Sequence, residues 1–411
     1  MAENTMIKAR PVRIIPFDLG RTLHEIDISD IKNYIECKCN SLTLTPRQES
    51  ILKGVEVVFR KNSMISGFIY GNGICVIVVN DAQILFRDKV ESFSIRYGEN
   101  RKQAHSEFFK WKHETSSEIW TIIGDLRGII EKNTGRGTRV RRSATTTFEN
   151  KGLSYIMTLS FFDINESIIS STTFRKYPDW LKSNIYALLD PAVLYLEDSS
   201  KFESCSEIDF DLNKILQEIE IDEDVVDYER HKHANTFMSW AAVVVCGQLQ
   251  ETDVEEYTAL EVQLQCDWFY VYCLDKCLDD FTHPTKKELI EIQEQNYEVD
   301  LLVNRLYDFD DSSMPTRVLD IQKGLVTSSG LDGNIQHLQR KIQYILEREQ
   351  LNSSLRQKRL SQSTEILLFI VAFIEIAPTV EEYGSRLFPY AGVIANALLV
   401  IIGVVLLLRK D

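Results

Sequence analysis

The chain has 411 residues, and its 46 basic and 61 acidic residues leave a formal net charge of −15. Hydrophobic residues make up 44% and charged residues 26%, a balance typical of globular proteins that excludes a largely disordered chain. The acidic balance argues against direct nucleic-acid binding, because proteins with that function usually carry a basic face.

Residues 1–233 are predicted to form an α/β domain that ends in an acidic helical segment. RPVRIIPFDL and GVEVVF are typical of strands, and GFIYGNGICVIVVN has β-rich runs on both sides of Gly71-Asn72-Gly73, which predicts a hairpin. Residues 105–132 have helical periodicity, and GLSYIMTLSFFDI and PAVLYLED return to strand character. Residues 203–229 carry eleven carboxylates and one basic residue, Lys214. A solvated amphipathic helix and a regulatory cation site both fit this segment.

A cluster of arginines interrupts the acidic chain in the stretch GRGTRVRR, residues 135–142. Arginine is suited to bidentate phosphate contacts and to stacking on a base, and glycine lets backbone N–H groups approach an anion. We therefore predict a phosphate-binding segment, with a basic surface loop as the alternative. Its predicted ligand-binding residues are Arg136, Arg139, Arg141 and Arg142. Tyr70, Trp111 and Trp120 could stack on an adenine or belong to the core.

From residue 234 to 363 we predict a helical region and a stalk. Thr285 and Glu288 form a capping box after Pro284, and the helix that it opens should extend to about Phe309. A second, longer helix should begin after Gly330, since no helix-breaking residue occurs between positions 334 and 377. Its apolar residues repeat at spacings of three and four and predict packing against other helices: Ile335, Leu338, Ile342 and Ile345, then Leu351 and Leu355.

The eight cysteines agree with a reducing cytoplasm, and none of their spacings is typical of a zinc site. Cys273 and Cys277 lie one helical turn apart in an apolar stretch, which favours buried packing over metal binding.

Two apolar segments, residues 364–380 and 390–408, are predicted to cross a membrane. The second has no charged residue over nineteen positions, about the length needed to cross a hydrocarbon core of roughly 30 Å. A link of about ten residues, EEYGSRLFPY, predicts a hairpin of the two helices. Basic residues flank the hairpin at Arg356, Lys358, Arg359, Arg409 and Lys410, whereas the link contains only Arg386. The positive-inside rule then places both termini in the cytoplasm, in a multi-pass protein of the inner membrane.

One face of the first segment carries polar residues at spacings of three and four. A carboxylate within an apolar span is costly unless it faces water or a partner, so Glu375 is the informative member of this face. Around a central axis it would form an acidic ring that favours cations, and apolar neighbours would form a constriction. The predicted pore-lining residues are Thr364, Leu368, Val371, Glu375, Thr379 and Glu382. The alternative is that Glu375 reaches the lipid headgroups.

The segment RQKRLSQSTEILLFIVAFIEIAPTVEEYGSRLF resembles the CorA family of two-span cation channels. Pro378-Thr379 lies where the family often has a Pro-Leu-Thr motif, and Tyr383-Gly384 matches the start of its Tyr-Gly-Met-Asn outer loop. Ser385 and Arg386 replace Met-Asn, and an arginine ring cannot hold hydrated magnesium as that asparagine does. The resemblance implies an α+β fold with an N-terminal cytoplasmic α/β domain, a long helical stalk and a C-terminal two-helix transmembrane hairpin. It also implies a homopentamer.

With Met-Asn lost, the chain resembles a divergent branch of that family, encoded beside type III CRISPR systems, more than a housekeeping transporter. The resemblance implies an antiviral membrane channel effector that is opened by the nucleotide second messenger SAM-AMP and disrupts ion balance. Its partners would be further copies of itself, the nucleotide and the bilayer, with no covalent cofactor and with a divalent cation as an additional ligand. Two alternatives remain, a magnesium transporter and a non-conducting membrane-anchored sensor. No catalytic motif supports an enzyme.

Overall fold

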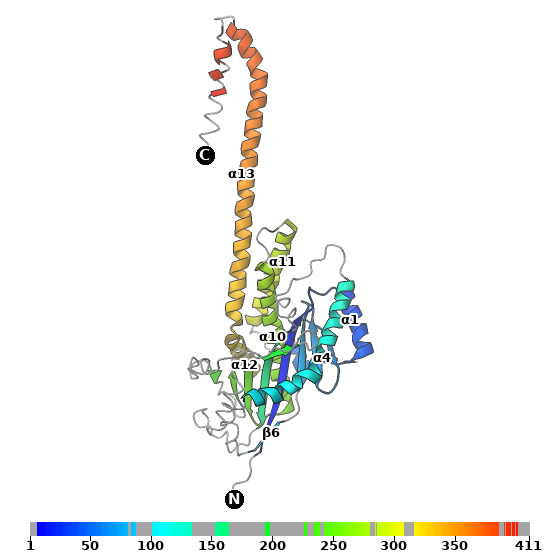
Figure 1. Ribbon diagram of the computed structural model, residues 1–411. Helices are drawn as coiled ribbons and strands as arrows, with labels where there is room; N and C mark the ends of the chain where they lie inside the picture. Colours follow the sequence, from blue (N-terminus) through cyan, green and yellow to red (C-terminus); the bar gives the residue numbers. More distant parts are fainter. Residues whose placement is uncertain are drawn as a thin grey trace. The chain divides into compact units, whose positions relative to one another are not determined.

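A computed structural model describes a large part of the chain: residues 6–80, 84–87, 101–133, 153–163, 194–197, 226–227, 234–238, 242–279, 284, 286–307, 316–385, 390, 392–395, 397–398 and 400–401. The chain divides into two compact units, Met1–Lys341 and Ile342–Asp411. Each unit is described by itself below. The first contains a mixed β-sheet with helices packed on it, and most of the second is one long helix (Figure 1).

The sheet is built around β1, which pairs antiparallel with β5 on one side and β7 on the other. Its strand order is β2-β3-β4-β5-β1-β7-β11-β10-β9, with β6 pairing with β1 and β8 with β7. β7 and β11 run parallel, whereas the other described pairs are antiparallel, so the sheet is mixed. The strands are β1 (Met6–Asp18), β2 (Asn40–Ser41), β3 (Val55–Arg60), β4 (Ile65–Tyr70), β5 (Ile74–Asn80), β6 (Ile84–Arg87), β7 (Leu153–Asp163), β8 (Leu194–Glu197), β9 (Val226–Asp227), β10 (Ala234–Met238) and β11 (Ala242–Gly247).

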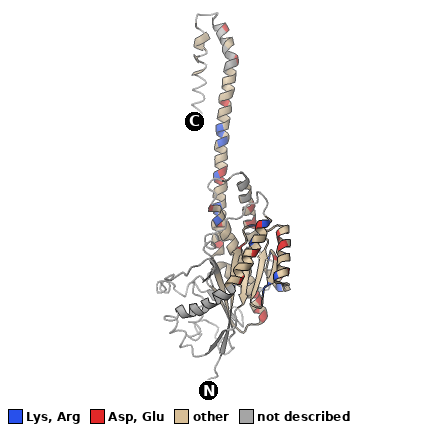
Figure 2. Cartoon of the chain, turned by 45° about the vertical axis from the view of Figure 1, so that its right-hand side comes forward, with Lys and Arg blue, Asp and Glu red and all other residues tan. Residues whose placement is uncertain are grey.

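Helices lie between and after these strands. In the described residues they are α1 (Glu25–Lys38), α2 (Pro46–Ile51), α4 (Arg101–Lys132), α10 (Glu251–Asp279), α11 (Lys286–Tyr307), α12 (Thr316–Ser328) and α13 (Leu331–Ser385). Figure 2 colours the positions of acidic and basic residues along several of them, including α13.

One face of the sheet is covered by α1 and α4. Ile15 and Phe17 of β1 point to this face and are fully buried. α4 places Ile119, Ile122, Ile123, Leu126 and Ile130 in the same core, at the spacings of three and four that form one helix face. Trp120 packs edge-to-face on Phe17 with ring centroids 5.3 Å apart, which supports the core interpretation of this aromatic residue.

The opposite face of the sheet is covered by α10. Phe161 of β7 contacts Tyr257 of α10 edge-to-face, with ring centroids 6.2 Å apart. Ile156, on the same strand, lies in the core under α4. Because side chains alternate along a strand, Ile156 and Phe161 point to opposite faces, so the sheet separates α4 from α10.

The predicted hairpin is confirmed as β4 and β5. Gly73 has φ +83°, a left-handed conformation that glycine adopts without strain, and its N–H donates to the carbonyl of Tyr70 at 2.9 Å. The side-chain oxygen of Asn72 accepts from the N–H of Ile74 at 3.1 Å. Tyr70 itself is only 2% exposed and belongs to the core.

The prediction of helices alone from residue 234 onward is wrong for its first part. Residues 234–238 and 242–247 form β10 and β11, and the helical region begins only at Glu251. All residues of β11 are buried. A strand that is covered on both faces is apolar at every position and does not alternate between apolar and polar residues. A short apolar run of this kind cannot be assigned to a strand or a helix by periodicity alone.

The predicted long helix is confirmed and extends beyond its expected end. α13 has 55 residues, so it is about 80 Å long at 1.5 Å per residue. It begins after Gly330, whose φ of +66° ends α12. The predicted outer link is helical over residues 381–385, since α13 continues to Ser385 with Pro378 inside it.

Candidate functional site

The six residues predicted to line a pore lie on one unbroken stretch of α13. At 100° per residue they fall within an arc of about 80°, because the helix continues through all six positions. All six are exposed in the single chain, with Leu368 at 62% and Val371 at 44%. The hydroxyl of Thr364 donates to the carbonyl of Leu360 at 2.9 Å, which satisfies it within the helix. From base to tip the face therefore presents a hydroxyl, two apolar side chains and then Glu375, Thr379 and Glu382.

The residues predicted for the outer loop are placed only in part. Tyr383, Gly384 and Ser385 form the end of α13, so they belong to a helix and not to a loop. Arg386 lies outside the described residues. Within the described residues, no helix is both long and apolar enough to cross a membrane. The predicted segments 364–380 and 390–408 both include positions whose side chains lie outside the described set.

The predicted phosphate-binding arginines, Arg136, Arg139, Arg141 and Arg142, also lie outside the described residues, as do the acidic positions 203–225 and 228–229. The described chain does show where the arginine segment starts, at the C-terminal end of α4. There the side-chain amide of Asn133 donates to Asp30 of α1 at 2.9 Å. Close by, the buried pair of Arg21 and Asp27, 2.7 Å apart, holds the start of α1. The described residues include no cluster of ligands suited to a metal ion.

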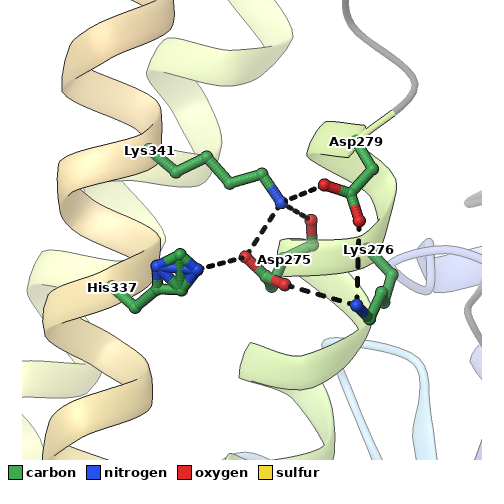
Figure 3. Close-up of polar contacts among 5 residues, drawn as sticks. All are labelled: Asp275, Lys276, Asp279, His337 and Lys341. Atoms are coloured by element: carbon green, nitrogen blue, oxygen red, sulfur yellow. Dashed lines mark hydrogen bonds and ion pairs between the residues drawn. The ribbon is translucent and has the colours of Figure 1, made fainter.

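A charged cluster that the sequence did not predict joins the end of α10 to the beginning of α13 (Figure 3). Nζ of Lys341 on α13 lies 3.0 Å from Oδ1 of Asp275 and 2.6 Å from Oδ1 of Asp279, both on α10. His337, one helical turn before Lys341, lies 4.0 Å from Asp275. Lys276 is 3.8 Å from Asp279 on the other side. The hydrogen bond from Lys341 lowers the pKa of Asp279, so this carboxylate stays ionised at neutral pH.

This cluster forms because the first turns of α13 pack within the first unit. The first turns of α13 bury Leu331, Ile335 and Leu338, and the ion pair lies beside them with the Lys341 side chain 20% exposed. The carboxylates lie four residues apart, on one face of α10. The sequence spacing predicts that Asp275 and Asp279 lie on the same face of α10. It does not predict that Lys341, more than sixty residues later, contacts both of them. The arrangement attaches the base of α13 to α10.

α10 also buries an ionisable group that the sequence did not single out. Glu261 is 1% exposed, and its Oε1 accepts a hydrogen bond from the Gln265 amide at 2.7 Å. Burial raises the pKa of Glu261 to about 7. A second buried amide–carboxylate contact links Gln263 to Asp267 at 3.1 Å. Cys273 and Cys277 on the same helix are buried, as predicted from their spacing.

Comparison with known proteins adds no assignment to this geometry. No protein family matches the chain, and no curated protein or solved structure shows significant similarity to it. The site is therefore interpreted from its own residues.

Proposed function

We propose that the chain is a homo-oligomeric, CorA-like membrane channel that is opened by a nucleotide second messenger bound in its N-terminal part. The observation that carries this proposal is the continuity of α13. One helix of 55 residues begins within the first unit and carries the six predicted pore residues on a single exposed face. A ligand-induced change at its base can therefore act on the face that contains Glu375.

The pore proposal rests on the chemistry of that face. Leu368 and Val371 are large apolar side chains left exposed in the single chain, and Glu375 follows one turn above them. Further copies of the same helix around an axis would cover the apolar pair and surround water with the carboxylates. We propose a pentamer with segment 364–380 inside and 390–408 outside, in the inner membrane and with both termini in the cytoplasm.

The messenger proposal rests on the residues that suit a nucleotide. Arg136, Arg139, Arg141 and Arg142 are concentrated, together with Gly135 and Gly137, in one short stretch of an acidic chain, where guanidinium groups can bind phosphates bidentately. The segment starts at the end of α4, which packs on the central strand β1. SAM-AMP is the proposed ligand, in the setting of type III CRISPR antiviral defence, and a divalent cation is an additional one. Neither a covalent cofactor nor a catalytic step is part of this proposal.

Two other functions would use the same helix. A magnesium transporter is favoured by Pro378-Thr379 and Tyr383-Gly384 and disfavoured by the pair Ser385-Arg386. A membrane-anchored sensor without conduction is favoured by no particular residue, but it would explain the apolar segments equally well. The three functions differ in whether ions pass and in what starts the flux.

The test is ion flux through the purified full-length protein in liposomes. We expect cation efflux that starts on addition of SAM-AMP and not on addition of cyclic oligoadenylates. Efflux without nucleotide that magnesium suppresses would favour the transporter. Nucleotide binding without any flux would favour the anchored sensor, and neither binding nor flux would contradict the proposal altogether.

A further inference from the structure

A band of positive charge crosses α13 below its apolar part, in the second unit. Between Glu349 and Glu365 the helix carries three charged residues, Arg356, Lys358 and Arg359, and all three are basic. All three are also exposed, and Figure 2 shows blue ribbon segments partway along this helix, the colour of lysine and arginine. In a chain with a net charge of −15, this band has the opposite sign from the whole.

The three side chains point in different directions around the helix. At 100° per residue, Lys358 lies about 200° and Arg359 about 300° around the axis from Arg356. A partner protein that docks on one side of the helix would contact at most two of them. A layer that surrounds the helix would contact all three, at nearly the same height, because the band is only about 5 Å tall.

The residues next to the band show how such a layer would lie. Leu360, directly after the band, is 68% exposed, and a nearly continuous run of exposed apolar side chains follows at Ile366, Leu367, Leu368 and Ile370, each 42–62% exposed. Arg359 precedes Ile366 by seven residues, or about 10 Å along the axis, a distance that the long arginine and lysine side chains can shorten by reaching upward. The phosphate region of a bilayer borders the hydrocarbon core at such a distance.

Two hydroxyls between the band and Ile366 are satisfied within the helix, and Glu365 follows them as the last charged residue before Ile366. The hydroxyl of Ser363 donates to the carbonyl of Arg359 at 3.0 Å, and that of Thr364 donates to the carbonyl of Leu360 at 2.9 Å. These hydroxyls are satisfied inside the helix and need no bulk water, which lets them approach the hydrocarbon.

We propose that Arg356, Lys358 and Arg359 form a belt that binds the phosphate groups of anionic phospholipids where α13 meets the membrane surface. This inference rests on the proposed membrane function and adds a partner to it, a lipid of defined charge. Arginine binds phosphate oxygens bidentately, lysine adds a point charge, and both are attracted to an anionic leaflet. The belt would hold α13 at a set depth.

The test uses the full-length protein in detergent, mixed with phosphatidylglycerol or phosphatidylcholine, and then reconstituted in vesicles of each lipid. We expect it to retain phosphatidylglycerol in preference to phosphatidylcholine and to lose that preference at high salt. The triple variant Arg356→Gln, Lys358→Gln, Arg359→Gln should weaken phosphatidylglycerol retention by about a hundredfold at low salt. The matched control Arg340→Gln, Arg348→Gln changes two exposed arginines of the same helix that lie farther from Ile366, and it should retain the lipid normally.

Four outcomes would overturn the belt. One is equal retention of the two lipids by a protein that reconstitutes well, which leaves the membrane function intact. Another is unchanged preference in the triple variant. A third is competition by inorganic phosphate as strong as that by phosphatidylglycerol, which would make the belt a site for soluble anions. The fourth is loss of oligomers in the triple variant with its lipid preference intact, which would place the belt between copies of the chain. Failure to enter vesicles of either lipid would contradict the proposed function together with the belt.

Discussion

Lys341 and Asp279 lie 2.6 Å apart, between the first turns of α13 and the last turn of α10. The same ammonium group reaches Asp275, so one lysine pairs with two carboxylates that lie four residues apart. Together with the contact of His337 with Asp275, this lysine links α10 to the helix that carries the proposed pore face. It gives the base of α13 a defined position in the sheet-containing unit.

Replacing Lys341 with Met should destabilise the protein by about 1–2 kcal/mol, at the low end for charged hydrogen bonds because Asp279 is 55% exposed. The pKa of Asp279 is lowered in the folded protein. The ion pair with Lys341 therefore stabilises the protein at neutral pH, and this stabilisation is lost as the pH falls through that lowered pKa. Thermal unfolding of the detergent-solubilised protein at pH 7 measures it. Lys276→Met is the control, since its Nζ lies 3.8 Å or more from either carboxylate, and an equal effect there would contradict the assignment.

Replacing Glu261 with Gln should stabilise the protein above pH 7. The pKa of this buried carboxyl is raised to about 7, so the folded state holds a proton that the unfolded state releases. Stability therefore falls as the pH rises from about 4.5 to 7, and removing the charge should recover about 2–3 kcal/mol at pH 8. The glutamine fits the same space and can still accept from Gln265.

The measurement for Glu261 is the midpoint of unfolding between pH 5 and pH 8. In the parent protein this midpoint should fall as the pH rises, and in the Glu261→Gln variant it should depend less on pH. Glu255→Gln, an exposed position of the same helix, should leave the slope unchanged. A parent protein with no loss of stability between pH 5 and pH 7 would show that Glu261 is ionised throughout.

Replacing Gly67 with Ala should destabilise the sheet by about 1–3 kcal/mol. A Cβ at this position would lie 2.3 Å from Cζ of Phe59, its cross-strand partner, whose ring is fully buried and cannot move aside. Gly128→Ala in α4 is the opposite case: its Cβ would meet nothing within 4 Å, and the helix should gain about 1 kcal/mol. Thermal midpoints that shift in the same direction for both variants would contradict this packing.

Replacing Glu375 with Gln should reduce cation flux and cation selectivity, because a ring of charge disappears while the pore width barely changes. Glu365→Gln provides the matched control. It removes the same charge from the same helix, but it lies about 80° around the axis from Glu375. Nucleotide-triggered efflux from liposomes is the measurement, and equal flux in both variants would show that Glu375 does not face the pore.

Replacing Arg386 with Asn should shift the ion preference of the proposed channel toward divalent ions, while opening should still depend on the nucleotide.

Under the proposed function, replacing Arg139 and Arg141 with Glu should abolish SAM-AMP binding and leave folding intact, since arginine is a residue type that folded proteins mostly leave exposed. Calorimetric titration of the detergent-solubilised protein measures the binding. Unchanged affinity in the double variant would show that these arginines take no part in the site.

Much of the fold follows from local patterns in the sequence. The hairpin of β4 and β5 depends on a Gly-Asn-Gly turn, α4 on apolar residues at spacings of three and four, and α13 on a long stretch without a helix breaker. Each of these signals acts between residues that are near in the chain, so it can be interpreted without knowing what packs on it. The same periodicity places the six pore-face residues within one arc of α13.

Contacts between segments that are distant in the sequence could be identified only from the tertiary structure. β11 is a strand because it pairs in parallel with β7, about eighty residues earlier, and its continuous apolar run is equally compatible with a buried helix. Glu261 is buried because α10 packs both on the sheet and on α11 and α12, which no helix periodicity reveals. Lys341 contacts Asp275 and Asp279, which precede it in the sequence by 66 and 62 residues. A charge can pair with any opposite charge, and only the packing of α13 selects this pair.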